Sequence, residues 1–345
     1  MANRLVTQVM SDVSDLACVL ANMSLNKLTR TIEYKDADEV TIKGSNNIGF
    51  ELNGKWWVLD TDVDLATGSD MDTGAISNGK DYCVYACDNS GTLEFLISLA
   101  STYPAGYAVA TSRKLGGFHT LCVDVGTIAG HPSAYATANS ILPQSVWDLK
   151  HRALNKNMSN AGLVYNDSNP GWEFIYLGSD DGASGVQSVY GATILDTIDW
   201  MDYTDRLAKV GMIMEDDGEF QSLAAGSNAE TNITGSADPV TTGGHVDTAS
   251  RRMISNIGCE DCCGALRQWL KDQSMFFDDA VVAGWYDLPG SKGSLYRRVD
   301  SNDVKLLAGG DWTNAARCGS RCRSATDYRW DTHTDVGGRG RSCGL

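Results

Sequence analysis

The chain has 345 residues, of which 42% are hydrophobic and 21% charged, and its formal net charge is −16. This length exceeds what one core usually organises, so we expect more than one domain. The negative charge repels phosphate backbones and anionic lipids, which argues against nucleic acid as a partner. No stretch of the sequence approaches the roughly 20 apolar residues of a membrane span, so we expect no membrane insertion and folding in a cytoplasm.

The first predicted segment covers residues 1–39. Its apolar residues recur at spacings of three and four, as at Val6, Val9, Val13 and Leu16. This spacing predicts an amphipathic helix whose apolar stripe can self-associate. We therefore interpret residues 1–39 as an N-terminal oligomerisation or attachment segment.

An antiparallel β-domain is predicted for residues 40–138. Short apolar or alternating runs, such as Ile48–Leu52 and Trp56–Leu59, are separated by breakers such as Asn53-Gly54. An Asn-Gly pair between apolar runs is a strong hairpin signal. A connector rich in Gly and Ala, near residues 124–140, ends this domain.

Residues 139–345 read as a second domain of mixed structure. Strands are predicted at Gly162–Tyr165 and Trp172–Leu177, and helices at Thr197–Met212 and Asp216–Ala225. The second helix begins with acidic residues, which favour a helix N-terminus. Helices set among antiparallel strands predict an α+β fold class for this domain.

The most informative segment is residues 306–345. It contains no Lys, Glu, Gln or Met, although it holds six of the sixteen arginines of the chain. Between its Gly, Trp and Arg residues stand mostly Asp, Thr, Asn, Ala, Ser and His. Randomising the adenines of AAC codons would produce this set and never Lys, Glu, Gln, Met or Trp. The composition therefore indicates a diversified surface, although a Gly- and Arg-rich strand pair with a polar face explains it about as well.

Ordered motifs decide between these two interpretations. The terminal segment contains Gly309-Gly310-Asp311-Trp312, Tyr328-Arg329-Trp330 and Gly337-Gly338-Arg339-Gly340-Arg341, and the β-domain contains Asp81-Tyr82-Cys83-Val84-Tyr85-Ala86-Cys87-Asp88. Together these motifs resemble the phage tropism determinants, a family of variable proteins diversified by retroelements. The first forty residues do not match the N-terminal β-prism of that family.

The resemblance implies a C-type-lectin-like domain at residues 139–345, with its variable region at about 306–345. It implies a receptor-binding protein of a phage tail fibre, made in the host cytoplasm and acting at the host cell surface. Its partners would be a host receptor of protein or glycan, two further copies in a homotrimer, and other tail-fibre proteins. It implies no enzyme activity, no catalytic residue and no cofactor.

A recognition surface must vary without unfolding the protein, and exposed polar substitutions usually change stability by less than about 0.5 kcal/mol. The alternation Asp-Thr-His-Thr-Asp at residues 331–335 is expected to place varied side chains on one face of a strand. The predicted ligand-binding, variable positions are Asp311, Thr313, Asn314, Ala316, Arg317, Ser324, Thr326, Asp327, Asp331, His333 and Asp335. The predicted structural scaffold is Trp312, Arg321, Arg323, Trp330, Gly337 and Arg339, with Trp312 and Trp330 as buried anchors and the arginines bonded to carbonyls or carboxylates.

Two groups of residues have the chemistry of metal ligands. Asp331, His333 and Asp335 form a plausible partial coordination sphere, but random choice at variable positions produces the same spacing. Cys259, Cys262 and Cys263, with His245 upstream, fall short of two separated cysteine pairs. We interpret these thiols as packed core residues and expect no bound metal.

Two alternative functions remain. Formylglycine-generating enzymes share this fold class, and the stretch Gly264–Trp269 resembles one of their motifs imperfectly. Such an enzyme would need a reactive cysteine pair, for which Cys318 with Cys322 or Cys343 is the available choice. A diversified bacterial lectin-like binding protein, with no virion involved, is the other alternative. The motifs upstream of the terminal segment favour the phage protein.

Overall fold

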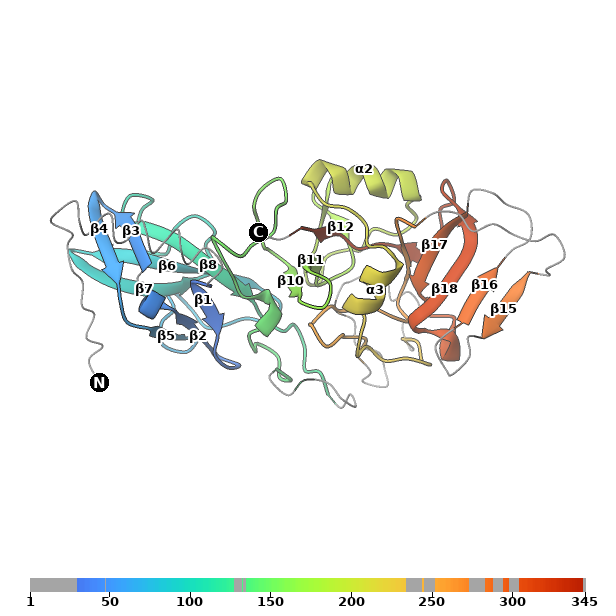
Figure 1. Ribbon diagram of the computed structural model, residues 1–345, viewed down its shortest axis with the longest axis horizontal. Coiled ribbons are helices and arrows are strands. Elements are labelled where there is room, and N and C mark those ends of the chain that lie inside the picture. Colours follow the sequence, from blue (N-terminus) through green and yellow to red (C-terminus); the bar gives the residue numbers. More distant parts are fainter. Residues whose placement is uncertain are drawn as a thin grey trace. The chain divides into compact units, whose positions relative to one another are not determined.

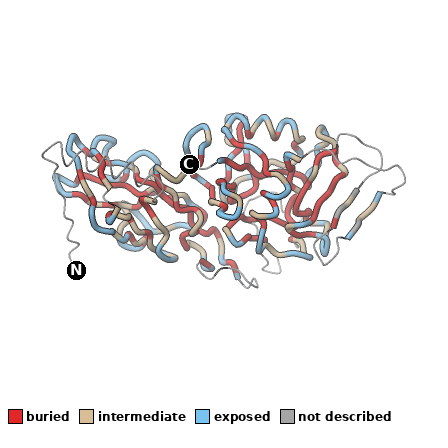
Figure 2. Tube along the Cα trace, in the orientation of Figure 1, coloured by how far each residue is buried: buried red, intermediate tan, exposed pale blue. Residues whose placement is uncertain are grey.

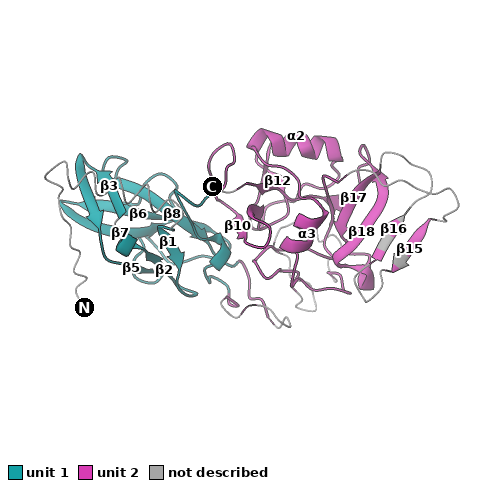
Figure 3. Cartoon of the chain, in the orientation of Figure 1, with its two compact units in different colours: residues 1–121, 138–152, 345 teal, residues 122–137, 153–344 magenta. Residues whose placement is uncertain are grey.

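A computed structural model describes residues 30–46, 48–126, 132, 135–233, 244, 252–272, 283–287, 294–297 and 304–343 (Figure 1). The chain divides into two compact units (Figure 3): unit 1 comprises residues 1–121, 138–152 and 345, and unit 2 comprises residues 122–137 and 153–344. Both are built mainly from β-strands, and the described residues include two α-helices, both in unit 2. No helix among the described residues is long and apolar enough to cross a membrane. The helix predicted within residues 1–39 lies almost wholly outside the described residues.

Unit 1 consists of three antiparallel sheets. The first has the order β1-β2-β5, with β1 at Ile32–Tyr34, β2 at Glu39–Ile42 and β5 at Val63–Ala66. The second is a hairpin of β3 (Ile48–Leu52) and β4 (Lys55–Leu59). The third has the order β7-β6-β8-β9, with β6 at Asp81–Asn89, β7 at Thr92–Ser98, β8 at Ser112–His119 and β9 at Trp147–Asp148.

The β3–β4 hairpin turns at Asn53 and Gly54, as the sequence predicted. Both residues have positive φ, 54° and 70° respectively. A two-residue turn of this kind matches the right-handed twist of the flanking strands, and Asn and Gly are the residues that reach positive φ at least cost. The turn thereby brings Phe50 and Trp57, which are paired across the ladder, into the same buried core.

The limits of unit 1 differ from those predicted for the β-domain. β1 pairs with β2 through Ile32 and Ile42, so the sheet begins before residue 40. Residues 138–152 return to unit 1, where β9 pairs with β8. The Asp148 carboxylate also accepts a hydrogen bond from the backbone N–H of Thr31 (2.5 Å). Such long-range pairing leaves no local pattern in the sequence, which is why the division expected at residue 139 was wrong.

Unit 2 is organised around a six-stranded mixed sheet. Its order is β15-β16-β18-β17-β14-β19, with β14 at Arg267–Trp269, β15 at Gly284–Asp287, β16 at Ser294–Arg297, β17 at Val304–Gly309, β18 at Gly319–Tyr328 and β19 at Val336–Gly337. Two smaller sheets are β10-β11-β20 (Leu163–Asn166, Gly171–Phe174, Arg341–Ser342) and β12-β13 (Ser179–Asp180, Val186–Gln187). Figure 2 shows that the central strands β17 and β18 are largely buried, whereas the turns at their ends reach the surface.

Both α-helices of unit 2 occur where the sequence predicted them. α2 (Trp200–Val210) begins after Asp199, whose side chain accepts from the N–H of Asp202, and ends at Gly211 in the left-handed conformation. α3 (Asp217–Leu223) begins with a capping box between Asp216 and Glu219. These caps satisfy backbone groups that have no partner within the helix. They also explain why each helix is a few residues shorter than predicted.

Candidate functional site

The turn after β17 projects the first predicted variable residues. Gly309 and Gly310 have φ values of 89° and 78°, a region that other residues rarely adopt. A Cβ at Gly309 would lie 2.6 Å from the carbonyl oxygen of Cys262, so the close approach also requires glycine. Beyond the turn, the Asp311 carboxylate accepts from the N–H (2.7 Å) and the hydroxyl (2.6 Å) of Thr313. The turn is therefore held by its own side chains.

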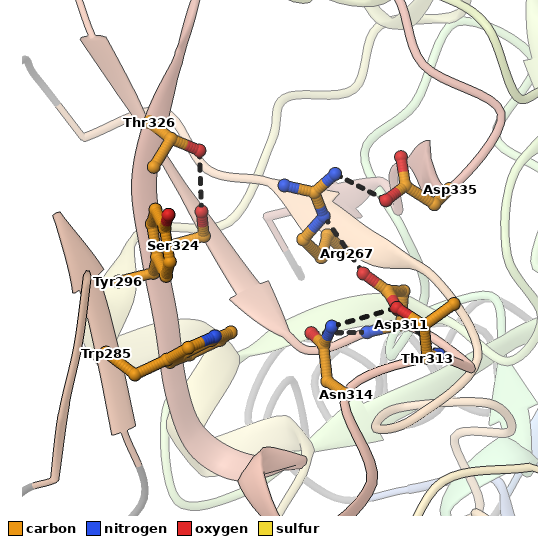
Figure 4. Close-up of a pocket in the computed structure, with 9 residues that line it drawn as sticks. All are labelled: Arg267, Trp285, Tyr296, Asp311, Thr313, Asn314, Ser324, Thr326 and Asp335. Atoms are coloured by element: carbon orange, nitrogen blue, oxygen red, sulfur yellow. Dashed lines mark hydrogen bonds and ion pairs between the residues drawn. The ribbon is translucent and has the colours of Figure 1, made fainter. Parts of the chain in front are cut away.

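A pocket of about 220 Å³ opens beside this turn (Figure 4). It is lined by Arg267, Trp285, Tyr296, Asp311, Thr313, Asn314, Ser324, Thr326 and Asp335. Six of these nine were predicted as variable positions, and they come from β18 and from the turns after β17 and before β19. The fold thus gathers positions up to 24 residues apart, from Asp311 to Asp335, around one recess.

Arg267, the first residue of β14, connects three of the predicted variable aspartates. Its guanidinium lies 3.3 Å from Asp311, 3.0 Å from Asp327 and 2.5 Å from Asp335. Its side chain is only 16% exposed, so water screens these ion pairs less than on an open surface. Burial raises the pKa of the Asp311 carboxyl, although its bonds from Thr313 and the charge of Arg267 oppose the shift. The arginine therefore fixes the acidic side of the pocket.

The opposite side of the pocket is aromatic. Trp285 on β15 and Tyr296 on β16 meet edge to face, with ring centroids 5.2 Å apart and planes at 76°. In Figure 4 these rings lie across the recess from Arg267 and Asp335. The guanidinium of Arg317 lies 5.1 Å from the centroid of the Trp285 ring. A wall of rings facing carboxylates and hydroxyls suits a ligand with a flat apolar face and polar or cationic edges.

The other predicted variable positions lie outside the pocket lining. Ala316 and Arg317 are exposed on the 3-10 helix Ala315–Arg317. Asp331 and His333 lie in the segment that follows β18, and His333 is 48% exposed. Asp327 is buried, at 6% exposed, with its carboxylate paired to Arg267.

Two expectations about this surface need correction. Residues 331–335 form a loop and turn, and not the strand expected from their alternation, because β18 ends at Tyr328. Asp327 faces inward, and Asp311 and Ser324 are also buried, at 2% and 4% exposed. These three side chains have partners within the protein that the alternation of residue types did not reveal.

The predicted scaffold arginines Arg323 and Arg339 are both buried and multiply bonded. Arg339 is fully buried and donates to the carbonyls of Phe174 (2.6 Å), Ile175 (2.8 Å) and Glu260 (2.5 Å). A guanidinium carries five N–H donors in a fixed fork, so it can satisfy several irregular segments at once. This is the geometry that the sequence analysis expected of these arginines.

Arg323 contacts the helix α3 rather than the pocket. It pairs with Asp217, donates to the carbonyls of Ser320 and Cys322 (both 2.8 Å), and lies over the ring of Phe220. The strand β18 is thus tied to α3 on its buried side while Ser324 and Thr326 face the pocket. One strand therefore carries both an anchor and displayed side chains.

Two residues assigned to the scaffold are not buried. Trp330 is 54% exposed and stacks on Tyr328 at 5.0 Å between centroids, so its role as a buried anchor was wrong. Arg321 is exposed as well, although the next four residues of β18 are all buried. Trp312 is partly buried against the core cluster that contains Leu266, and a Cβ at Gly337 would lie 2.8 Å from the carbonyl oxygen of Leu195.

Two of the cysteines proposed for the enzyme alternative, Cys318 and Cys322, are unsuited to nucleophilic chemistry. Cys318 and Cys322 are each 1% exposed. Burial raises the pKa of Cys318, and it raises that of Cys322 to about 12. Because the thiolate is the reactive form, neither thiol is activated. Cys259 and Cys263 are also buried, and desolvation raises the pKa of both thiols, whereas His245 lies outside the described residues.

Three pocket residues escaped the sequence analysis. Arg267, Trp285 and Tyr296 come before residues 306–345, so the composition of that segment did not point to them. Arg267 lies within Gly264–Trp269, a stretch singled out only for its imperfect resemblance to a motif of the formylglycine-generating enzymes. Their contribution depends on β14, β15 and β16 entering one sheet, which the sequence does not reveal.

Comparisons with known proteins agree with this architecture. Residues 31–148 match the family model described as Mtd second domain. The chain is 26% identical over 294 residues to the tail fiber receptor-binding protein of Bordetella phage BPP-1, covering 79% of this chain and 71% of that protein.

Solved structures are similar over more of the chain. The U1 variant of the Major Tropism Determinant superposes with a TM-score of 0.72 at 23% identity, over 92% of this chain and 84% of that one. The P3c variant gives a TM-score of 0.73 at 22% identity, over 99% and 86%. Residues 31–148 are thus a match to the Mtd second domain, and the chain has the mostly-β, C-type-lectin-like fold of the Major Tropism Determinant, which confirms the resemblance to the phage tropism determinants.

Proposed function

We propose that this chain is the receptor-binding protein of a phage tail fibre and determines which host the phage recognises. The observation that carries the proposal is the pocket, where six predicted variable residues surround one recess at the surface. A relative that is a tail fiber receptor-binding protein supports it. The matched relatives are receptor-binding proteins and not enzymes, which agrees with the absence of an activated thiol at Cys318 and Cys322.

The pocket and its rim contact the receptor. Thr313, Asn314 and Thr326 offer hydroxyl and amide groups, and Trp285 with Tyr296 offers an apolar wall. Ala316 and Arg317 extend this surface onto the neighbouring 3-10 helix. The receptor is a protein or glycan on the host cell surface, and the protein acts there as part of the virion tail after its synthesis in the host cytoplasm.

The variable residues arise by retroelement diversification of residues 306–345, within a lectin-like domain that follows the β-domain. Three copies assemble with other tail-fibre proteins, and the segment preceding the β-domain serves assembly or attachment. Small polar side chains bind weakly in one copy, and linking several copies strengthens binding by about 10²–10⁴-fold. The composition of the terminal segment supports the diversification, because it lacks Lys, Glu, Gln and Met.

A cell-binding assay tests the proposal. Fluorescently labelled full chain is added to a panel of bacterial strains, and bound fluorescence is measured by flow cytometry. For strains that bind, the substitutions Thr313→Asp and Ala316→Asp should reduce binding at least tenfold. Val109→Ser, at a 73% exposed position in unit 1, serves as the matched control and should bind like the unsubstituted protein. Binding that survives both substitutions, one in the pocket lining and one on the neighbouring 3-10 helix, would reject this surface as the receptor site.

The origin of the variation has a separate test in the gene. Retroelement diversification predicts a near-copy of the 3′ end of the gene close by, with adenines at the differing positions, beside a reverse transcriptase gene. Codons other than NNC at Thr313, Asp331 and His333 would contradict it. Sedimentation of the full chain measures whether it forms a trimer.

A further inference from the structure

Three metal-ligating side chains converge just after β18. One donor atom from each of Asp327, Asp331 and His333 lies within 4.8 Å of the other two. From the sequence, Asp331, His333 and Asp335 are a plausible partial coordination sphere, for which no bound metal is expected. In the structure Asp327, and not Asp335, shares this group with Asp331 and His333, while the Asp335 carboxylate lies 2.5 Å from Arg267.

The spacing of these donors fits a small divalent ion. In a tetrahedral site with bonds of about 2.0–2.1 Å, neighbouring donor atoms are separated by about 3.4 Å. Nε2 of His333 and Oδ1 of Asp327 are 3.3 Å apart. The two atoms can therefore bind one ion with little movement. Asp331 has to adjust only its side chain, since its backbone is held through the N–H of Asp331 to the carbonyl of Tyr328 (3.0 Å).

Contacts outside the cluster orient both carboxylates. Oδ2 of Asp327 accepts from Arg267 (3.0 Å) and from the hydroxyl of Thr326 (2.9 Å), which leaves Oδ1 directed at His333. Oδ2 of Asp331 accepts from the N–H of Tyr328 (2.8 Å). Hydrogen bonds of this kind hold metal ligands in position and strengthen binding. Asp327 is also 6% exposed, so its carboxylate is anchored in the interior while His333 is half exposed.

Arg267 and Lys305 are cations near this cluster, and Arg267 already pairs with one of its members, Asp327. The charge of Arg267 is divided among Asp311, Asp327 and Asp335. Lys305, which is paired with Asp327 across the β17–β18 ladder, places its ammonium 4.4 Å from the centroid of the Trp200 ring. A bound divalent ion would add a positive charge beside Asp331 and His333. The charge of Arg267 is already shared by Asp311, Asp327 and Asp335.

We propose that Asp327, Asp331 and His333 form a binding site for Zn²⁺ or a similar transition-metal ion. An imidazole nitrogen with two carboxylate oxygens favours such ions over Ca²⁺ and Mg²⁺, which take oxygen ligands. Three protein ligands leave a fourth position for water or for an oxygen of a partner molecule. The site uses three of the predicted variable positions, but all three protein ligands come from this chain, so metal binding can be measured without a receptor.

Titration calorimetry with ZnCl₂ on the full chain tests the site, with the Cys343→Ser substitution as background because Cys343 is an exposed thiol that can also bind zinc. We expect one Zn²⁺ per chain, and Co²⁺ in its place should give the visible absorption bands of a four-coordinate ion. Ca²⁺ should bind at least tenfold more weakly than Zn²⁺.

Variants separate the site from adventitious binding. His333→Ala and Asp331→Asn should each weaken Zn²⁺ binding at least tenfold, and both lie on a surface loop where folding is not at stake. Asp335→Asn is the matched control, because it removes the same charge from the same loop and should bind Zn²⁺ like the background protein. Equal binding by His333→Ala and the background protein would overturn the proposal. So would the absence of binding at millimolar Zn²⁺, which would leave His333 and Asp327 as an ion pair only.

Discussion

Unit 2 contains two clusters of charge built around arginines, and they differ in how far they are closed. In the inner cluster, Arg339 is fully buried and Arg341 is 6% exposed, beside the buried carboxyls of Glu173 and Glu215. In the outer cluster, Arg267 is partly exposed and holds aspartates that line an open pocket. The inner arginines bond mainly to backbone carbonyls and to acids outside the terminal segment, whereas the three carboxylates paired with the outer arginine belong to predicted variable residues. The difference separates positions that determine the fold from positions that can change.

The largest expected effect comes from breaking the inner cluster. Arg339→Ala would leave the carbonyls of Phe174, Ile175 and Glu260 without their donor, which should cost more than about 4 kcal/mol. Thermal denaturation followed by circular dichroism should show Tm lowered by at least roughly 8 °C. Arg321→Ala, at an exposed arginine, is the control and should leave Tm nearly unchanged. Similar losses for the two variants would refute the distinction between closed and open clusters.

An intermediate effect is expected from Arg267. Arg267→Met removes the partner of three carboxylates, two of which are buried, and should destabilise unit 2 by about 2–4 kcal/mol. Urea denaturation at neutral pH measures the loss. A variant as stable as the unsubstituted protein at neutral pH would show that the outer cluster does not stabilise unit 2 and serves only to present side chains at the pocket.

The inner cluster should also make stability depend on pH. Burial raises the pKa of Glu215 to about 7, against the opposing charge of Arg339. The unfolded chain releases this proton near pH 4.5, so the stabilisation is complete below that pH and is lost as the pH rises to about 7. The change amounts to on the order of 2–3 kcal/mol. Glu215→Gln should therefore gain stability relative to the unsubstituted protein between pH 5 and pH 7, as measured by urea denaturation.

The pH dependence that remains in the Glu215→Gln variant provides a control for this gain in stability. Glu173 is also buried, and its pKa is raised by desolvation and by Glu215, so the residual pH dependence of the Glu215→Gln variant should have the same sign. A pH profile of the variant parallel to that of the unsubstituted protein would mean that Glu215 is ionised in the folded state throughout.

The smallest effects are expected on the open side. Ala316→Ser changes an exposed side chain and should alter the free energy of unfolding by less than about 0.5 kcal/mol. Thr313→Ala also removes one hydrogen bond to Asp311 and should cost about 1 kcal/mol. Gly310→Ala, only three residues before Thr313, should cost more because its φ of 78° is strained for alanine. If Thr313→Ala proved as destabilising as Gly310→Ala in urea denaturation, the rim would be part of the scaffold.

Local features of the fold were predictable from sequence, and long-range features were not. The Asn53-Gly54 turn and the two helices follow from residues close to one another in the chain. The same holds for Gly309 and Gly310, whose conformation only glycine reaches readily. Residues 138–152 return to unit 1 through the pairing of β9 with β8. The sequence carries no periodic signal for this pairing.

The candidate site shows the same limit. The composition of residues 306–345 predicted a set of variable positions, and six of the predicted positions line the pocket. It did not indicate that Asp327 turns inward or that Trp330 turns outward, because alternation is broken where β18 ends at Tyr328. Arg267 and Trp285 were out of reach, since they join the pocket only through the order of the strands in the six-stranded sheet.

The pairing of β20 with β11 has a consequence for how the protein is made. Arg341 lies opposite Glu173 in that ladder, so the two strands are separated by 168 residues of chain. Contacts of such range form slowly because the intervening chain must be ordered first. A ribosome must therefore complete residues 306–345 before Arg339 and Arg341 can lock the interior. Products shortened within that stretch would lack both arginines and expose a polar, unfinished core, so proteolysis would remove them before they reached a virion.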